Sequence, residues 1–312
     1  MAFGSRWPAL PQILSLLSLL SFRLHYKRDY HAPRRAPRAS IIAIELTVEQ
    51  TANIERSYAA LKGMHYLDQH EILNVVRAAL SPTRREKYFT LIYHRAILNV
   101  ETILYLTEGK HFQAVAGLTR TIFELAVDIR LIDRIDNAIE KMALFRDIEK
   151  LKAARHIVDF KQAHPDAKVH TNSHEKFVAA HGKHIDAAKA LMWPGKEPRL
   201  THWCREKMPQ RAKLVGGPLY EIHELQYSQL SWYIHSGITG VEGLGPAGFA
   251  SLVGVAFNIA LESYMQILEA IIDEFKIAKA DPLIRSRMQY ARMMPFTPSE
   301  QELSDLREGL GL

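Results

Sequence analysis

Cysteine is nearly absent from this sequence, since Cys204 is the only one in 312 residues. An intrachain disulfide is therefore excluded, and a reducing compartment such as the cytoplasm fits best. A lone cysteine is also a candidate nucleophile, and His202 stands two residues before it. We expect a short helix over 201–208, in which these two side chains would point in different directions. Packing is therefore the favoured role for Cys204.

Net charge is missing from most of the chain. The whole sequence carries a formal charge of +6 and has a pI near 9.2. Residues 1–40 alone supply +6, because they hold seven Lys and Arg residues and one Asp. Residues 41–312 are therefore neutral overall, and this composition gives no support to a nucleic-acid partner.

Long apolar runs are scarce, and the one with the length of a signal peptide, PALPQILSLLSLLSF, lies near the start. It is too short to span a membrane comfortably, its basic residues mostly follow it, and no clear cleavage site appears. Three interpretations compete: a membrane-surface anchor, a transit-like leader, or a basic extension that does not fold. Pro33, Pro37 and the arginines favour the unfolded extension. Any membrane contact would be confined to residues 1–40.

Strand patterns are also scarce, and SIIAIEL at 40–46 is the only candidate. From Leu46 onward the apolar residues follow a helical period, and no internal repeat is visible. The sequence therefore predicts an all-α multi-helix bundle of about seven to nine helices. We expect a basic extension over 1–40, a single helical domain over 41–295, and a short C-terminal helix or tail over 296–312.

Capping and breaking residues set the expected helix boundaries. Thr47–Gln50 has the pattern of a capping box that opens a helix. Two long helices within 85–136, separated by Gly109, predict a central αα-hairpin. Pro165 ends the following helix, and Gly243–Gly248 form a turn. The remaining helices are expected at about 137–163, 173–191, 201–208, 249–277 and 297–303.

The second helix of this hairpin, FQAVAGLTRTIFELAVDIRLI, is apolar on nearly every side. One line of charge interrupts it, with Arg120, Glu124 and Asp128 spaced four residues apart. An unpaired charge in such surroundings is costly, so we expect Arg120 to pair with Glu124 one turn away.

The segment YSQLSWYIHSG, at 227–237, repeats this pattern with a line of Tyr227, Ser231 and His235 among apolar residues. Two nearly fully buried helices, each with one polar line, most economically face each other. We therefore expect the line of Tyr227 to meet the line of Arg120 and Glu124.

Signals for a cofactor or a metal are weak. Helical spacing places several histidines near one face, but the segment is polar and lacks an H-E-x-x-H pair, so a solvated surface is favoured over a zinc site. The carboxylates of the apolar helix lack the Glu-x-x-His motifs of di-iron bundles. We predict no cofactor and no metal. The histidines are His170, His174, His181 and His184.

Three motifs in this order, LTRTIFELAVD, MWPGKEPRLTHWCREK and YSQLSWYIHSG, carry a family resemblance. The chain resembles the bacterial helical proteins of domain-of-unknown-function family 5677, over roughly Ser81 to Leu268. The resemblance implies a shared pattern of an Arg and a Glu one turn apart, followed by Tyr, Ser and His. In this chain the pattern maps onto Arg120, Glu124, Tyr227, Ser231 and His235.

The family is also similar to the wider class of helical HEPN-type proteins, some of which are metal-independent ribonucleases. The signature of those nucleases is an Arg followed, after four to six residues, by a His. Here Arg85 and His94 are separated by eight residues, and Arg146 and His156 by nine. This departure argues against nuclease activity.

Two functional hypotheses follow. The first is a metal-independent hydrolase or ribonuclease-like enzyme of bacterial stress or defence. In it His235 acts as general acid and base, Arg120 stabilises an anion, and Glu124 orients either one. Tyr227 and Ser231 would supply hydroxyl groups. The second is a non-catalytic module for protein interaction or oligomerisation, in which the same cluster is structural. The sequence identifies no partner, and a homo-oligomer stays open.

Overall fold

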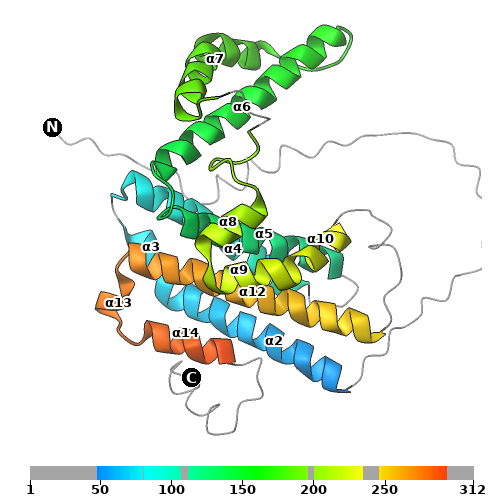
Figure 1. Ribbon diagram of the computed structural model, residues 1–312, viewed down its shortest axis with the longest axis vertical. Coiled ribbons are helices and arrows are strands. Elements are labelled where there is room, and N and C mark those ends of the chain that lie inside the picture. Colours follow the sequence, from blue (N-terminus) through cyan, green and yellow to red (C-terminus); the bar gives the residue numbers. More distant parts are fainter. Residues whose placement is uncertain (1–47, 80, 107–111, 196–199, 235–245, 294–312) are drawn as a thin grey trace, which may run out of the picture. The chain divides into compact units, whose positions relative to one another are not determined.

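A computed structural model describes residues 48–79, 81–106, 112–195, 200–234 and 246–293 (Figure 1). Within these ranges the chain contains helices and no strand, which confirms the predicted all-α bundle. The helices are α2 (Val48–Leu67), α3 (Leu73–Ala78), α4 (Arg84–Tyr105), α5 (Phe112–Leu131), α6 (Ala138–Ala163), α7 (Asn172–Met192), α8 (Met208–Val215), α9 (Gly217–Ile222), α10 (Ser228–Ile234), α12 (Pro246–Glu274), α13 (Ile277–Ala280) and α14 (Ile284–Met293).

Helix α12 lies at the centre of the main core. It packs against α2, α4 and α5, and its residues Tyr264, Leu268 and Ile271 are completely buried. In the described part of the chain, Leu252–Glu274 is the one helix long and apolar enough to cross a membrane, and 72% of its apolar window is buried. Burial inside the bundle accounts for this apolar composition.

Helices α4 and α5 pack together as the predicted αα-hairpin. A capping box starts α4: Thr83 Oγ1 accepts a hydrogen bond from the Glu86 N–H at 3.1 Å, and the Glu86 carboxylate accepts one from the Thr83 N–H at 2.5 Å. These two bonds satisfy N–H groups that a helix start leaves open. Gly109 lies outside the described residues. Helix α5 is less buried than predicted: Gln113 and Ala114 are exposed, and the three charged residues Arg120, Glu124 and Asp128 are half-buried.

Helices α6 and α7 form a second hairpin with a small apolar cluster of its own (Figure 1). Ile148 and Leu151 of α6 pack there with Ile185 of α7. Helix α6 ends at Ala163, two residues before Pro165, as expected, because proline cannot continue the hydrogen-bond ladder.

Several predicted boundaries were wrong, and three other predicted segments cannot be compared. Residues 201–207 form a turn, and α8 begins only at Met208, with Pro209 in its first turn, where a proline costs no hydrogen bond of the helix. Helix α12 begins at Pro246 for the same reason, inside the predicted turn. Helix α14 was not anticipated. Thr47 and the segments 40–46 and 297–303 lie outside the described residues.

One buried carboxylate joins three parts of the core. Asp68 is completely buried in a π-helical turn, Asp68–Ile72, that follows α2. It accepts hydrogen bonds from the hydroxyl groups of Tyr93 on α4 and Tyr264 on α12, the second at 2.5 Å. Burial raises the pKa of Asp68 to about 6, although both tyrosines lower it. The three groups fix the register of these helices against one another.

The raised pKa of Asp68 predicts how stability depends on pH. An unfolded aspartate titrates near 3.9, so native protein binds this proton more tightly than unfolded protein does. The stabilisation is complete below about pH 4 and is lost as pH rises towards 6. Relative to Asp68→Asn, the unfolding free energy of wild type should fall by roughly 2–3 kcal/mol between pH 4 and pH 7. Urea unfolding at four pH values measures this difference.

Asp186→Asn provides the matched control. The Arg155 hydrogen bond lowers the pKa of the exposed Asp186, so its contribution is lost only as pH falls through that lowered pKa. The free-energy difference between wild type and Asp186→Asn should therefore not decline between pH 4 and pH 7. If the difference in unfolding free energy between wild type and Asp68→Asn stays constant from pH 4 to pH 7, the result would contradict the role given to Asp68.

Candidate functional site

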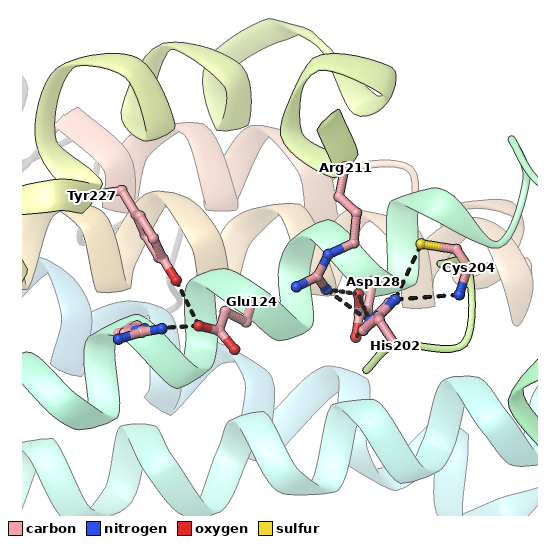
Figure 2. Close-up of polar contacts among 7 residues, drawn as sticks. Glu124, Asp128, His202, Cys204, Arg211 and Tyr227 are labelled. Carbon is pink, nitrogen blue, oxygen red and sulfur yellow. Dashed lines mark hydrogen bonds and ion pairs between the residues drawn. The ribbon is translucent and has the colours of Figure 1, made fainter. Parts of the chain in front are cut away.

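The predicted polar line on α5 meets the chain segment that contains Tyr227 (Figure 2). Glu124 Oε1 accepts two hydrogen bonds, one from Arg120 Nε at 2.8 Å and one from the Tyr227 hydroxyl at 2.7 Å. The guanidinium carbon of Arg120 lies 5.3 Å from the centre of the Tyr227 ring. The structure thus brings together Arg120, Glu124 and Tyr227 from the five residues proposed as a site.

The cluster is half-buried. The Arg120 and Glu124 side chains are 27% and 36% exposed, while Tyr227 is buried. Burial raises the pKa of Tyr227, and its hydrogen bond to Glu124 raises it further. Tyr227 is therefore a neutral hydrogen-bond donor at physiological pH, and it would not serve as a base.

Ser231 and His235 do not join the described cluster. The Ser231 hydroxyl donates to the backbone carbonyl of Tyr227 at 3.3 Å, the usual local bond of a serine within a helix. His235 lies outside the described residues. The catalytic roles proposed for these side chains stay predictions.

The segment that carries Tyr227 is less buried than predicted. A π-helical turn, His223–Tyr227, precedes α10 and adds a residue to the helical register. Tyr227 and Leu230 face the core, whereas Leu225 is 70% exposed. The ring of His223 stacks on Tyr227 with centroids 5.3 Å apart, which helps to hold the phenol against α5.

A second polar cluster lies one turn further along α5, around Asp128 (Figure 2). Arg211 Nη1 of α8 donates to Asp128 Oδ1 at 2.8 Å. His202 Nε2 lies 3.2 Å from Asp128 Oδ2, and His202 Nδ1 lies 3.1 Å from Cys204 Sγ. The thiol, the imidazole and the carboxylate therefore follow one another in a line.

The prediction that His202 and Cys204 face apart was wrong. It depended on a helix over 201–208, but Thr201–Lys207 form a non-helical turn that brings both side chains to one side. Arg205 takes a left-handed backbone conformation, with φ of 68°, and helps to close this turn. No helical periodicity predicts such a contact.

The pairing of Arg211 with Asp128 was not predicted from the sequence. Asp128 was recognised as the third charge on an otherwise apolar helix, and a half-buried carboxylate requires a cation or hydrogen-bond donors. That rule predicts that a partner exists. It does not say which of the chain's basic residues returns to α5, since Arg211 is 83 residues away in sequence.

The histidines of α7 are largely solvated, as the sequence favoured: His181 and His184 are exposed and His174 is half-buried. His170, which precedes the helix, is exposed. His181 stacks on Phe177, with ring centroids 5.1 Å apart. Across the described residues, no three His, Cys, Asp or Glu side chains are grouped closely enough to hold a metal ion.

A separate surface cavity of about 470 Å³ lies between α4, α5 and α12. Two arginines of this cavity are paired with neighbouring acids: Arg85 bonds to Glu274 at 2.8 Å and to Asp133 at 2.7 Å, and Arg130 bonds to Glu269 at 2.7 Å. These ion pairs tie the three helices together and include none of the predicted site residues.

The pair of Asp128 and Arg211 predicts a loss of stability when it is broken. In Arg211→Met the half-buried carboxylate keeps only its contact with His202. The unfolding free energy should fall by about 1.5–3 kcal/mol, which is typical of a hydrogen bond to a charged group. Lys213→Met is the control, because Lys213 is exposed on the same helix, and it should change stability by less than about 0.5 kcal/mol. Equal melting curves for the two variants would contradict a structural role for Arg211.

Comparison with known proteins gives one match. No curated protein and no solved structure matches this chain significantly, so the similarity to HEPN-type proteins stays a prediction. The sequence model of a family of unknown function, DUF5677, matches residues 86–245, just over half of the chain. This match runs from the first turn of α4 past α10 and includes both polar clusters of α5. The chain therefore belongs to the DUF5677 family.

Proposed function

We propose that this protein is a non-catalytic helical module that pairs with a second copy of itself through α4. One observation carries the proposal: Leu91, Leu98 and Tyr105 are 60%, 63% and 86% exposed, and they stand seven residues apart on this helix. A spacing of seven places all three on one face. Large apolar side chains aligned on an exposed helix face are typical of an interaction surface.

The stripe on α4 is complementary to itself. In an antiparallel pair related by a two-fold axis at Leu98, residues at equal distances from Leu98 face each other. Leu91 then packs against Tyr105 of the second copy. Arg95 and Glu101, each three residues from Leu98, bring opposite charges together on both sides of the axis. A second copy of this chain therefore fits the surface better than an unrelated partner.

The size of the stripe sets the expected strength of the dimer. Helix α4 has 22 residues, and a helix of that length spans about 33 Å. A single helix pair falls below the roughly 1,200 Å² of buried surface that stable complexes need. We therefore expect a weak dimer that responds to protein concentration.

The contacts of the polar line on α5 support this module over the enzyme. Glu124 Oε1 is already engaged by Arg120 and Tyr227, and Asp128 is engaged by Arg211 and His202. These contacts attach the segment from His202 to Tyr227 onto α5, which is a structural task. The hydrolase hypothesis needs His235 beside Arg120 and stays a prediction. The single cysteine favours the cytoplasm as the place of action.

Leu98→Asp tests the proposed interface. A charge at the two-fold axis would face its own copy, so the variant should be monomeric at concentrations where wild type dimerises. Sedimentation equilibrium of both proteins over a wide concentration range measures this. Leu283→Asp is the control, because Leu283 is 62% exposed and lies outside α4, and its dimerisation should match that of wild type.

A charge exchange tests the antiparallel register. Arg95→Glu or Glu101→Arg alone should weaken the dimer, because each places like charges opposite each other. The double variant Arg95→Glu/Glu101→Arg should recover it. A monomeric wild type at all concentrations, or a dimer unaffected by Leu98→Asp, would refute the assignment to α4.

A further inference from the structure

We propose that Cys204 is a nucleophilic thiol, with His202 as its proton acceptor and Asp128 as the positioning residue, for a small carbon electrophile that carries a carbonyl group. The site lies on α5 and on the turn before α8, and it uses no residue of the α4 stripe. It is therefore independent of the dimer proposed above.

The geometry joins two neighbouring residues, His202 and Cys204, to Asp128, which is 74 residues from His202 in sequence. His202 Nδ1 lies 3.1 Å from Cys204 Sγ, and His202 Nε2 lies 3.1 Å from Asp128 Oδ1. The backbone N–H of Cys204 also donates to His202 Nδ1 at 3.3 Å. This bond favours the tautomer in which Nδ1 carries the lone pair and faces the thiol. Nε2 then carries its proton towards Asp128, the order that a nucleophile and its base require.

Arg211 shares the same carboxylate. Its Nη1 lies 2.8 Å from Asp128 Oδ1 and 2.8 Å from His202 Nε2. Donation from Arg211 to Nε2 would stabilise the opposite tautomer, so the two arrangements compete. The carboxylate of Asp128 can accept from both donors at once, because it has two oxygen atoms.

The imidazole ring is held in place from several sides. Phe145 of α6 lies 6.3 Å from the His202 ring, and Trp203 lies 5.3 Å from it, measured between ring centres. The His202 side chain is only 14% exposed, whereas Cys204 is half-buried. A fixed base beside a partly accessible sulfur is the arrangement that nucleophilic catalysis uses.

The state of the thiol explains why a base is needed. Burial raises the pKa of Cys204, while the backbone hydrogen bond to Glu206 and the charge of Arg211 lower it. The negative charges of Asp128 and Glu206 also raise the pKa of Cys204. The net rise leaves Cys204 protonated at neutral pH, so attack on an electrophile requires transfer of its proton.

Two unsatisfied donors indicate the class of electrophile. In the described structure, Arg211 Nε and the indole Nε1 of Trp203 are buried and have no hydrogen-bond partner. Buried donors without an acceptor are rare, and each is costly to maintain. Arg211 contacts the His202 imidazole, and the Trp203 ring lies 5.3 Å from it, so a carbonyl group bound at this site would bring an acceptor close to both residues.

The step can be written with iodoacetamide, which carries an electrophilic carbon beside an amide carbonyl. Cys204 Sγ forms a bond to this carbon, the carbon–iodine bond breaks, and iodide leaves with its electron pair. The thiol proton moves to His202 Nδ1 and then to water. The product is a carbamidomethyl thioether on Cys204, and no oxidant or reductant takes part.

Comparing folded with unfolded protein tests the proposal without a variant. Cys204 is the only cysteine, so the mass gained by the full-length chain reports on this thiol alone. At pH 7, native protein should react faster than protein unfolded in guanidinium chloride at the same pH, by about tenfold or more. Burial without a base would make the native thiol the slower one, and that result would overturn the proposal.

Variants identify the base. His202→Gln should lower the native rate at pH 7 by about tenfold or more, and its rate should then rise with pH like that of an ordinary thiol. Asp128→Asn should also lower the native rate at pH 7, by a smaller factor than His202→Gln does. His223→Gln is the matched control, because the His223 side chain is 13% exposed and the His202 side chain 14%; its rate should match wild type. Equal rates for His202→Gln and wild type in folded protein would also overturn the proposal.

Discussion

The structure depends on one constraint: α5 packs against several helices of the core, yet it carries three charged residues on one line. Arg120, Glu124 and Asp128 must be satisfied where they stand, because a buried or half-buried charge without a partner costs several kcal/mol. Arg120 meets Glu124 within the helix itself. The other partners, Tyr227 and Arg211, come from the segment that returns after the α6–α7 hairpin. The polar line of α5 therefore determines where the segment containing α8, α9 and α10 is attached.

The same physical rule applies where α2, α4 and α12 meet. Among the described residues, the hydrogen-bond partners of Asp68 are two tyrosine hydroxyl groups, which bind its two oxygens in place of a cation. Apolar contacts alone allow neighbouring helices to slide, whereas a carboxylate held by two phenols has one arrangement. Polar groups thus anchor the described helices both inside the core, at Asp68, and along α5. Each joins segments that are distant in sequence.

The sequence predicts those parts of the fold and of the polar clusters that depend on local patterns. The apolar periodicity gave the α4–α5 hairpin, and the four-residue spacing gave the pair of Arg120 and Glu124. Contacts between distant segments could not be predicted in this way. Nothing local connects Asp68 with Tyr264, and the π-helical turn before Tyr227 changes a register that ordinary helical spacing assumes. The contact of His202 with Cys204 required a turn where a helix was expected, and His235 lies outside the described residues.

The contact between Glu124 and Tyr227 is an attachment that stabilises the fold, and a double-mutant cycle tests this most directly. Unfolding free energies would be measured for wild type, Glu124→Gln, Tyr227→Phe and the double variant. We expect the two changes to be coupled by about 1 kcal/mol or more, because both remove the same hydrogen bond. Effects that add to within about 0.3 kcal/mol would show that the contact contributes nothing to stability. That result would contradict the structural role of the polar line on α5.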